Sequence, residues 1–210
     1  MLEYDDLLAI LKNTLVKQTS SEVESPTSIV LETELPKYDL GVDKDTMRSN
    51  LELFADKTAL AESSRDFQAE SGLKGQAKGG YQWLTEVPDG EEGDQAAFRT
   101  ALNRLEGYYK RKNKRVPNWL KEAKEHNDPT KLSERQQTDL FYADIFQRKG
   151  TTVGSGEGYP QGKLQQIMID GNPNVMKDVY LQHWHTKPKD ISLESWDRVV
   201  ANANRSFNEE

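Results

Sequence analysis

The segments ALAESSRDF, at residues 59–67, and KGGYQWL, at residues 78–84, decide the predicted fold. Apolar residues recur at helical spacing before and into the first segment, and they predict a helix that ends near Ser63. Residues 66–82 are rich in glycine and polar side chains, which is typical of a loop or small hairpin. The sequence therefore predicts that Glu62 lies in the last turn of an apolar helix, shortly before a glycine-rich turn.

The residue types in these two segments suit a site that acts on sugars. Burial disfavours the charged form of a carboxyl, and a carboxyl that keeps its proton can protonate a glycosidic oxygen, so Glu62 is the candidate catalytic residue. The Gly-Gly pair lets a backbone approach a ligand, Tyr81 and Trp83 offer flat faces to sugar rings, and Gln82 offers a donor and an acceptor. Each feature also has a structural interpretation, as a solvated glutamate at a helix end and as a turn that leads into the core.

Taken together, the two segments resemble the soluble lytic transglycosylase branch of the lysozyme-like superfamily. In that family the catalytic glutamate ends a helix in an E-S motif, and a G-L-M-Q-like segment follows after a short loop. Glu62-Ser63 matches the first motif, and GGYQ at 79–82 matches the second with Gly-Tyr in place of Leu-Met. Further along, LFYADIF at 140–146 and YLQHWHTKP at 180–188 resemble segments of phage-encoded members.

The resemblance covers about residues 48–200 and implies a mainly α, lysozyme-like α+β domain. It implies cleavage of the β-1,4 bond between N-acetylmuramic acid and N-acetylglucosamine, with Glu62 acting first as acid and then as base while a 1,6-anhydro ring closes. The chain lacks the A-Y-N-A-G segment that supplies a tyrosine in the family, and Tyr142 and Tyr180 are the candidates to replace it. The expected substrate-binding residues are Ser63, Ser64, Gly80, Tyr81, Gln82, Trp83, Tyr142 and Tyr180.

A hydrolase of the ordinary kind needs a second carboxylate beside the catalytic acid. The candidates are Asp66, Glu70 and Glu86, and each stands in a segment that has the composition of a solvated loop. We therefore prefer a transglycosylase to a lysozyme-like hydrolase. The hydroxyls of Ser63 and Ser64 either bond to Glu62 or the substrate, or simply cap the helix end.

The composition excludes several classes of protein. The chain has 210 residues, a net charge of −7, 35% hydrophobic residues and no cysteine, so disulfide frameworks and thiolate metal sites are ruled out. It has no run of about 18 apolar residues, and its acidity argues against a dedicated nucleic-acid binder. His183 and His185 lack a clear third ligand, so we expect no metal and no cofactor.

The first 47 residues differ from the rest of the chain. They contain ten acidic and four basic residues, a net charge of −6, which leaves only −1 for residues 48–210. An amphipathic helix is expected at 2–17, which must bury its apolar face either on its own domain or on a partner, and an extended linker with a strand at 28–33 is expected after it. The acidic start lacks the features of a secretion signal. We expect residues 1–47 to be an arm that contacts other virion proteins, and residues 48–210 to be the enzyme domain.

Helical periodicity accounts for most of the remaining chain. The first long helix is expected to be capped by Asp45 or Thr46, Pro117 and Ser133 mark further helix starts, and Trp196 and Phe207 are expected to close the core. Residues 104–124 carry a local charge of +6 with interleaved aromatics, which suits phosphate binding, attraction to the carboxylates of wall peptides, or a solvated helix end. Further helices are expected at 94–112, 117–126, 132–148, 161–169, 173–185 and 192–204.

Two classes of function follow. The first is a peptidoglycan-cleaving enzyme in a phage tail or particle interior, which opens the cell wall locally during genome ejection and reaches the host envelope without a signal of its own. The second is a structural or adaptor protein of the tail or of an internal ejection assembly, which keeps the fold without activity.

Overall fold

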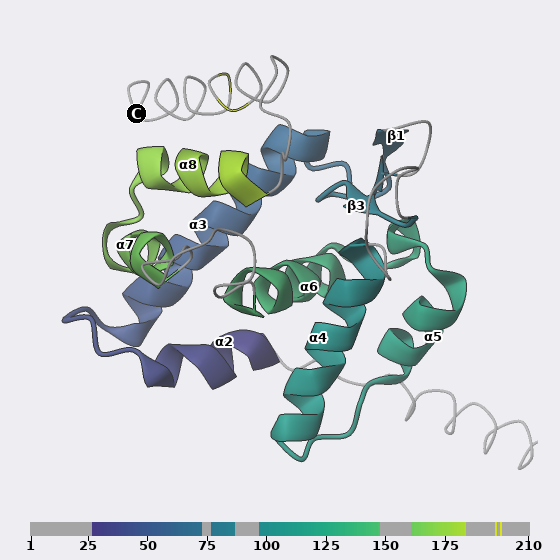
Figure 1. Cartoon of the computed structure of the whole chain (residues 1–210), viewed down its shortest axis with the longest axis horizontal. Helices are drawn as coiled ribbons and strands as arrows, with labels where there is room; N and C mark the ends of the chain where they lie inside the picture. The colour runs from purple at the N-terminus through teal and green to yellow at the C-terminus, as the bar shows by residue number, and fades with distance from the viewer. Residues whose placement is uncertain are drawn as a thin grey trace, which may run out of the picture.

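The protein is mainly helical, as the periodicity predicts. The computed structural model describes residues 27–72, 77–86, 97–147 and 161–183, together with Trp196 and Arg198. Figure 1 shows helices packed around a central helix, with a small sheet at one side. The helices are α2 (Ile29–Glu34), α3 (Lys44–Ser63), α4 (Ala97–Arg111), α5 (Asn118–His126), α6 (Glu134–Gln147), α7 (Gln161–Asp170) and α8 (Pro173–His183), with 3₁₀ turns η1 (Leu35–Lys37) and η3 (Pro129–Lys131).

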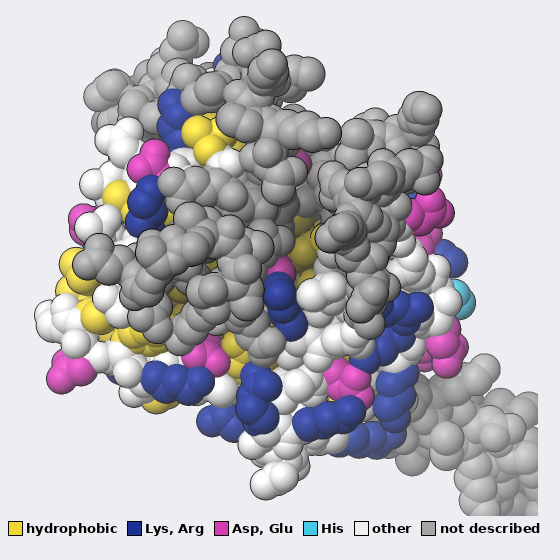
Figure 2. Space-filling view, viewed as in Figure 1, with side chains coloured by type: hydrophobic (Ala, Val, Ile, Leu, Met, Phe, Trp, Pro, Cys, Tyr) yellow, Lys and Arg dark blue, Asp and Glu magenta, His cyan; other side chains and the backbone are white. Residues whose placement is uncertain are grey.

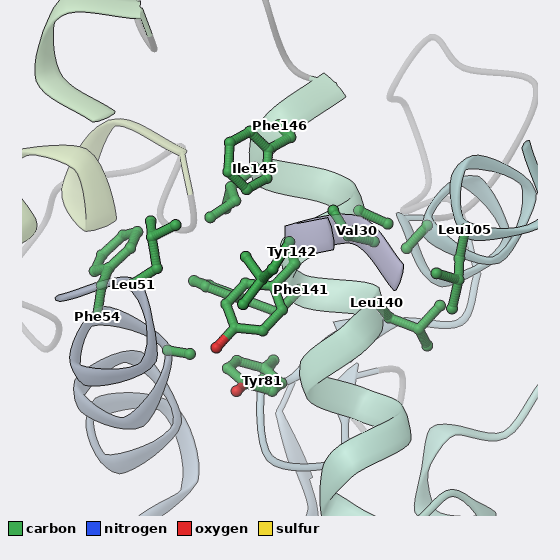
Figure 3. Packing of buried hydrophobic residues seen from close by; sticks show 14 of the residues in the cluster. Val30, Leu51, Phe54, Tyr81, Leu105, Leu140, Phe141, Tyr142, Ile145 and Phe146 are labelled. Atoms are coloured by element: carbon green, nitrogen blue, oxygen red, sulfur yellow. The ribbon is translucent and has the colours of Figure 1, made fainter. Parts of the chain in front are cut away.

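Helix α6 lies at the centre of the core. Every residue from Leu140 to Phe146 is buried, and the helix contacts α2, α3 and α4 on its different sides. Figure 3 shows the side chains of this stretch radiating from α6 towards these neighbours. The stretch includes one charged residue, Asp144, which forms an ion pair with Arg104 of α4. Such a pairing is needed because an isolated buried charge is strongly destabilising.

Helix α3 has the predicted buried face and the predicted end. Met47, Leu51 and Phe54 are fully buried, and the helix stops at Ser63. The N-cap is Asp43, whose carboxylate accepts from the backbone amides of residues 45 and 46 at 2.9 and 2.8 Å. The expectation of a cap at Asp45 or Thr46 was therefore wrong by two or three residues.

The predicted strand at 28–33 is wrong, because the chain forms helix α2 there. The Ser28 hydroxyl accepts from the amide of Val30 at 3.2 Å, which caps the helix start in spite of the β-branched pair that follows. Ile29 and Val30 are buried in the main core, so these residues do not form an extended arm. The boundary expected between residues 47 and 48 falls inside α3. Residues 1–26, with the helix expected at 2–17, lie outside the described residues.

A small antiparallel sheet follows α3, as the glycine-rich composition predicts. Strand β1 (Glu70–Gly72) pairs with β2 (Ala77–Lys78), and β2 pairs with β3 (Trp83–Leu84), in the order β1-β2-β3. The third strand was not predicted. Figure 1 shows the sheet beside the C-terminal end of α3, so the fold brings the two segments of the sequence motif together.

Helices α4 to α8 agree with the predicted ranges to within a few residues, and the helix expected at 192–204 lies outside the described residues except for Trp196 and Arg198. Pro117 and Ser133 stand immediately before α5 and α6, where helix starts were predicted. Trp196 is fully buried and stacks on Tyr180 with ring centroids 4.9 Å apart, so its predicted place in the core is confirmed. Phe207 lies outside the described residues. In the part of the chain that the structure describes, no helix is both long and apolar enough to cross a membrane.

Candidate active site at the end of helix α3

The side chain of Glu62 lies half-buried in the last turn of α3, and it accepts a hydrogen bond from the hydroxyl of Tyr180 on α8. The two helices are far apart in the sequence, and Figure 1 shows the C-terminal end of α8 close to the C-terminal end of α3. The fold therefore brings a phenol to the one carboxylate that the sequence motif singles out.

The surroundings of Tyr180 keep its phenol protonated. The residue is buried and stacks on Trp196. Burial, the negative charge of Glu62 and the hydrogen bond to Glu62 all raise the pKa of Tyr180 above its ordinary value, in that order of importance. The phenol therefore keeps its proton at neutral pH and remains a hydrogen-bond donor to Glu62.

The two serines after Glu62 shape the helix end. The Ser63 hydroxyl lies 3.1 Å from the carbonyl oxygen of Ala59 and 3.0 Å from that of Gly80, so it links the last turn of α3 to the glycine-rich turn. Ser64 is an exposed C-cap in the left-handed conformation, with φ of 57°. The Ser63 hydroxyl therefore bonds to backbone carbonyls at the helix end, as expected if it has a structural role there.

The two glycines of the motif are required by the packing of the protein itself. A Cβ on Gly79 would lie 2.5 Å from the Gln137 side-chain oxygen, and a Cβ on Gly80 would lie 2.4 Å from the Phe67 ring. Gly79 also has a φ of 78°, in the left-handed region. The close approach predicted for a ligand is thus an approach of Phe67 and Gln137 to the turn.

The expectation that Tyr81 and Trp83 offer open faces to sugar rings is wrong. They are only 1% and 2% exposed, respectively. Tyr81 stacks on Phe141 of α6 with ring centroids 4.8 Å apart, as Figure 3 shows, and its hydroxyl lies 3.0 Å from that of Thr138. Both rings are core residues: Tyr81 packs on the central helix, and Trp83 lies beside Tyr81 with ring centroids 6.3 Å apart.

The other predicted binding residues separate into two groups. The Gln82 side-chain amide donates to the Gly79 carbonyl at 3.0 Å, so it closes its own turn. Tyr142 is buried on α6, and burial raises its pKa. Of the two tyrosines considered as replacements for the missing family tyrosine, the one hydrogen-bonded to Glu62 is Tyr180.

Gln137 is the residue that the sequence analysis missed. It is fully buried on α6, and its side-chain oxygen accepts from the Gly80 amide at 2.8 Å. Its side-chain nitrogen lies 2.8 Å from the Phe67 carbonyl oxygen, 3.0 Å from that of Pro129 and 3.3 Å from that of Leu132. Gln137 therefore joins three backbone segments beside the site. Because Gln137 stands between two other polar residues, Gln136 and Thr138, the sequence gives no sign that its side chain is buried and bonded to these segments.

The candidate second carboxylates are exposed. Asp66 accepts from the amide of Gln68 at 2.9 Å, which is a local turn, and Glu70 lies 3.7 Å from the Lys78 ammonium across the sheet. Glu86 is exposed after β3. Within the described ranges, no group of three or more metal-ligating side chains comes together. The side chain of His183 and all of His185 lie outside those ranges.

The comparisons with known proteins gave no relative. No protein-family model, no curated protein and no solved structure matches the chain.

Proposed function

We propose that the chain is a peptidoglycan-cleaving enzyme of the lytic transglycosylase type with a lysozyme-like fold, and that Glu62 is its catalytic residue. The observation that carries the proposal is the hydrogen bond from Tyr180 to a half-buried glutamate at the end of an apolar helix, beside a small sheet. The motif resemblance supplies the substrate, which is the bond between N-acetylmuramic acid and N-acetylglucosamine.

A single carboxyl is sufficient for this chemistry. Glu62 donates its proton to the leaving glycosidic oxygen as the bond to the muramoyl C1 breaks. The resulting carboxylate then takes the proton of the muramoyl 6-hydroxyl, whose oxygen bonds to C1 and closes the 1,6-anhydro ring. Tyr180 stabilises the anionic carboxylate between the two steps by donating to it. The exposed positions of Asp66 and Glu70 favour this single-acid route over a two-carboxylate hydrolysis.

The biological setting that we propose is a phage particle, in the tail or the interior. There the enzyme would open the wall locally while the genome enters the cell. The acidic residues 1–47 would contact other virion proteins, and the described part of that segment contributes α2 to the enzyme's own core.

Product analysis tests the proposal. The purified chain is incubated with isolated peptidoglycan, and the soluble fragments are weighed by mass spectrometry. Fragments with 1,6-anhydro ends support a transglycosylase, and fragments with reducing ends indicate a lysozyme-like hydrolase. The absence of fragments from a folded chain would overturn the enzymatic proposal.

A second candidate is a non-catalytic structural or adaptor protein of the phage tail or internal ejection assembly. The observation that favours it is the structural use of the glycine-rich motif, in which the glycines, Tyr81 and Trp83 serve the packing of the protein. This candidate predicts equal, negligible wall cleavage by the unmodified chain and by Glu62→Gln.

A further inference from the structure

A positive surface lies at one end of the molecule, remote from Glu62. Residues 107–121 contain six lysines and arginines and no acidic residue, in a chain whose net charge is −7. Figure 2 shows dark-blue side chains gathered over the lower end of α4 and over α5. We call this surface the basic edge, and it consists of Lys110, Arg111, Lys112, Lys114, Arg115 and Lys121.

The backbone of the basic edge is held firmly. Helix α4 ends at Arg111, and the amides of Asn113 and Lys114 donate to the carbonyls of Lys110 and Tyr109 at 3.1 and 2.9 Å. The Arg111 guanidinium lies 4.4 Å from the centre of the Tyr108 ring. The charges are thus displayed from an ordered helix end.

Part of this charge is explained by the fold, and part is not. Lys110 lies 2.6 Å from Glu106, and Lys114 lies 2.9 Å from Glu32 of α2. The helix dipole favours cations in the last turn of α4, but it does not act beyond that turn. Lys112, Arg115 and Lys121 are exposed and have no ion-pair partner among the described residues. These three charges are available to an external anion.

Two classes of polyanion fit the basic edge poorly. Tyr108 is fully buried, and Tyr109 and Trp119 are partly buried against the core, so little ring surface of these aromatics is exposed for stacking on bases. Double-stranded DNA carries a charge about every 1.7 Å, and such a dense polymer would also meet the acidic remainder of the chain.

A membrane surface also fits poorly. The exposed large apolar residues among those described are Leu53 on α3 and Ile169 on α7, so the basic edge offers no apolar anchor for a lipid surface. Widely spaced carboxylates suit the edge better, because each needs only the local field within a Debye length of about 8 Å. Arginine in particular pairs with carboxylates through two parallel hydrogen bonds.

We infer that the basic edge is a docking surface for the free carboxylates of peptidoglycan stem peptides. This inference rests on the proposed function, because that function places the chain at the wall. Figure 1 shows the lower end of α4 on the opposite side of the molecule from the C-terminal end of α3. The basic edge would therefore hold the enzyme on its polymer without occupying the catalytic site.

Binding to insoluble peptidoglycan tests the inference separately from catalysis. The full chain carrying Glu62→Gln, so that the wall stays intact, is pelleted with purified peptidoglycan that lacks attached polymers. The first triple variant is Lys112→Gln/Arg115→Gln/Lys121→Gln. It should bind the wall about tenfold more weakly at moderate salt, as expected for the loss of three exposed ion pairs with wall carboxylates. The matched variant Lys44→Gln/Lys131→Gln/Lys163→Gln removes the same charge elsewhere and should bind like its parent. Amidation of the wall carboxylates should reduce binding of the parent chain to the level of the first triple variant.

Several outcomes would overturn the inference. Equal binding by the two triple variants is one, and binding that survives amidation of the wall is another. Tighter binding to double-stranded DNA or to vesicles of anionic phospholipid than to the wall would assign the edge to a different polyanion. Cleavage by the unmodified chain is measured in parallel, so wall binding without cleavage would contradict the proposed function and leave the docking surface intact.

Discussion

The Tyr180 phenol donates a hydrogen bond to the Glu62 carboxylate, and this contact joins α8 to the end of α3 at the candidate active site. The tyrosine is buried and stacks on Trp196, so its hydroxyl is held in place by the core. A donor fixed in this way limits the orientations of the carboxylate, which a group that both gives and takes a proton requires.

Replacing Tyr180 by Phe should lower peptidoglycan cleavage about 10- to 100-fold, because the carboxylate loses its fixed donor. The same change should cost about 1 kcal/mol of folding free energy, the usual net value of one hydrogen bond. The rate is measured by release of soluble muropeptides, and stability by denaturant unfolding. Tyr142→Phe is the matched control on α6, and it should cleave within about twofold of wild type. Equal rates for the two variants would remove Tyr180 from the site.

The stability of the protein should fall steeply at alkaline pH. Burial raises the pKa of Tyr81, Tyr142 and Tyr180 above the ordinary value of 10.0. The unfolded chain therefore loses these protons at a lower pH than the folded chain does. Stability from this source is fully present below pH 10 and is lost as the pH rises further, by about 1.4 kcal/mol per pH unit for each tyrosine.

Unfolding by denaturant at several alkaline pH values measures this loss, and ultraviolet spectroscopy of tyrosinate follows the titration. Tyr180→Phe should make the loss of stability with rising pH shallower by about 1.4 kcal/mol per pH unit, which is the contribution of one tyrosine. If Tyr81, Tyr142 and Tyr180 titrate near pH 10 in the folded chain, the buried contacts described for these three rings are wrong.

Gln137→Leu should destabilise the protein by about 3 kcal/mol or more, because it leaves the Gly80 amide and three carbonyl groups without their partner. The exposed Gln166 on α7 provides the control, since Gln166→Leu should change stability by less than about 0.5 kcal/mol. Both are compared by thermal and denaturant unfolding. Similar stabilities of the two variants would show that Gln137 does not join the segments around the sheet.

Gly80→Ala should destabilise the protein by about 1–3 kcal/mol, because the new methyl group would overlap the Phe67 ring. Gly162→Ala is the control on α7, where nothing lies near the added carbon, and it should be neutral or stabilising by up to about 1 kcal/mol. Adding Phe67→Ala to Gly80→Ala should recover part of the loss specific to the glycine. A Gly80→Ala variant as stable as wild type would show that packing against Phe67 does not require a glycine here. Ligand binding would then again be the explanation for this glycine.

The fold was predictable where one residue pattern had one physical meaning. The apolar spacing before Ser63 fixes both the buried face and the end of α3, because a helix must bury a continuous stripe. The strand expected at 28–33 failed because Ile29 and Val30 favour strands by type, whereas the Ser28 cap and the packing on α6 decide for a helix.

The candidate site was less predictable than the fold. A tyrosine or tryptophan after a glycine pair suits either a sugar-binding face or a core, and only the tertiary structure shows that Tyr81 and Trp83 are buried. The position of Gln137 was invisible because a polar residue beside other polar residues has the pattern of a solvated surface. Glu62 stands where the motif places it, and its pairing with Tyr180 depends on how α8 packs, which no local pattern encodes.

The most direct test of the central claim compares Glu62→Gln with Glu52→Gln, which makes the same change on the exposed side of the same helix. Both variants and the wild type are checked for folding, and their rates of muropeptide release from isolated peptidoglycan are measured. We predict that Glu62→Gln loses at least about 100-fold in rate, the contribution of a general acid and base, while Glu52→Gln stays within about twofold of wild type. A folded Glu62→Gln variant that cleaves as fast as wild type, or a wild-type chain that releases nothing, would contradict the claim that Glu62 is a catalytic residue.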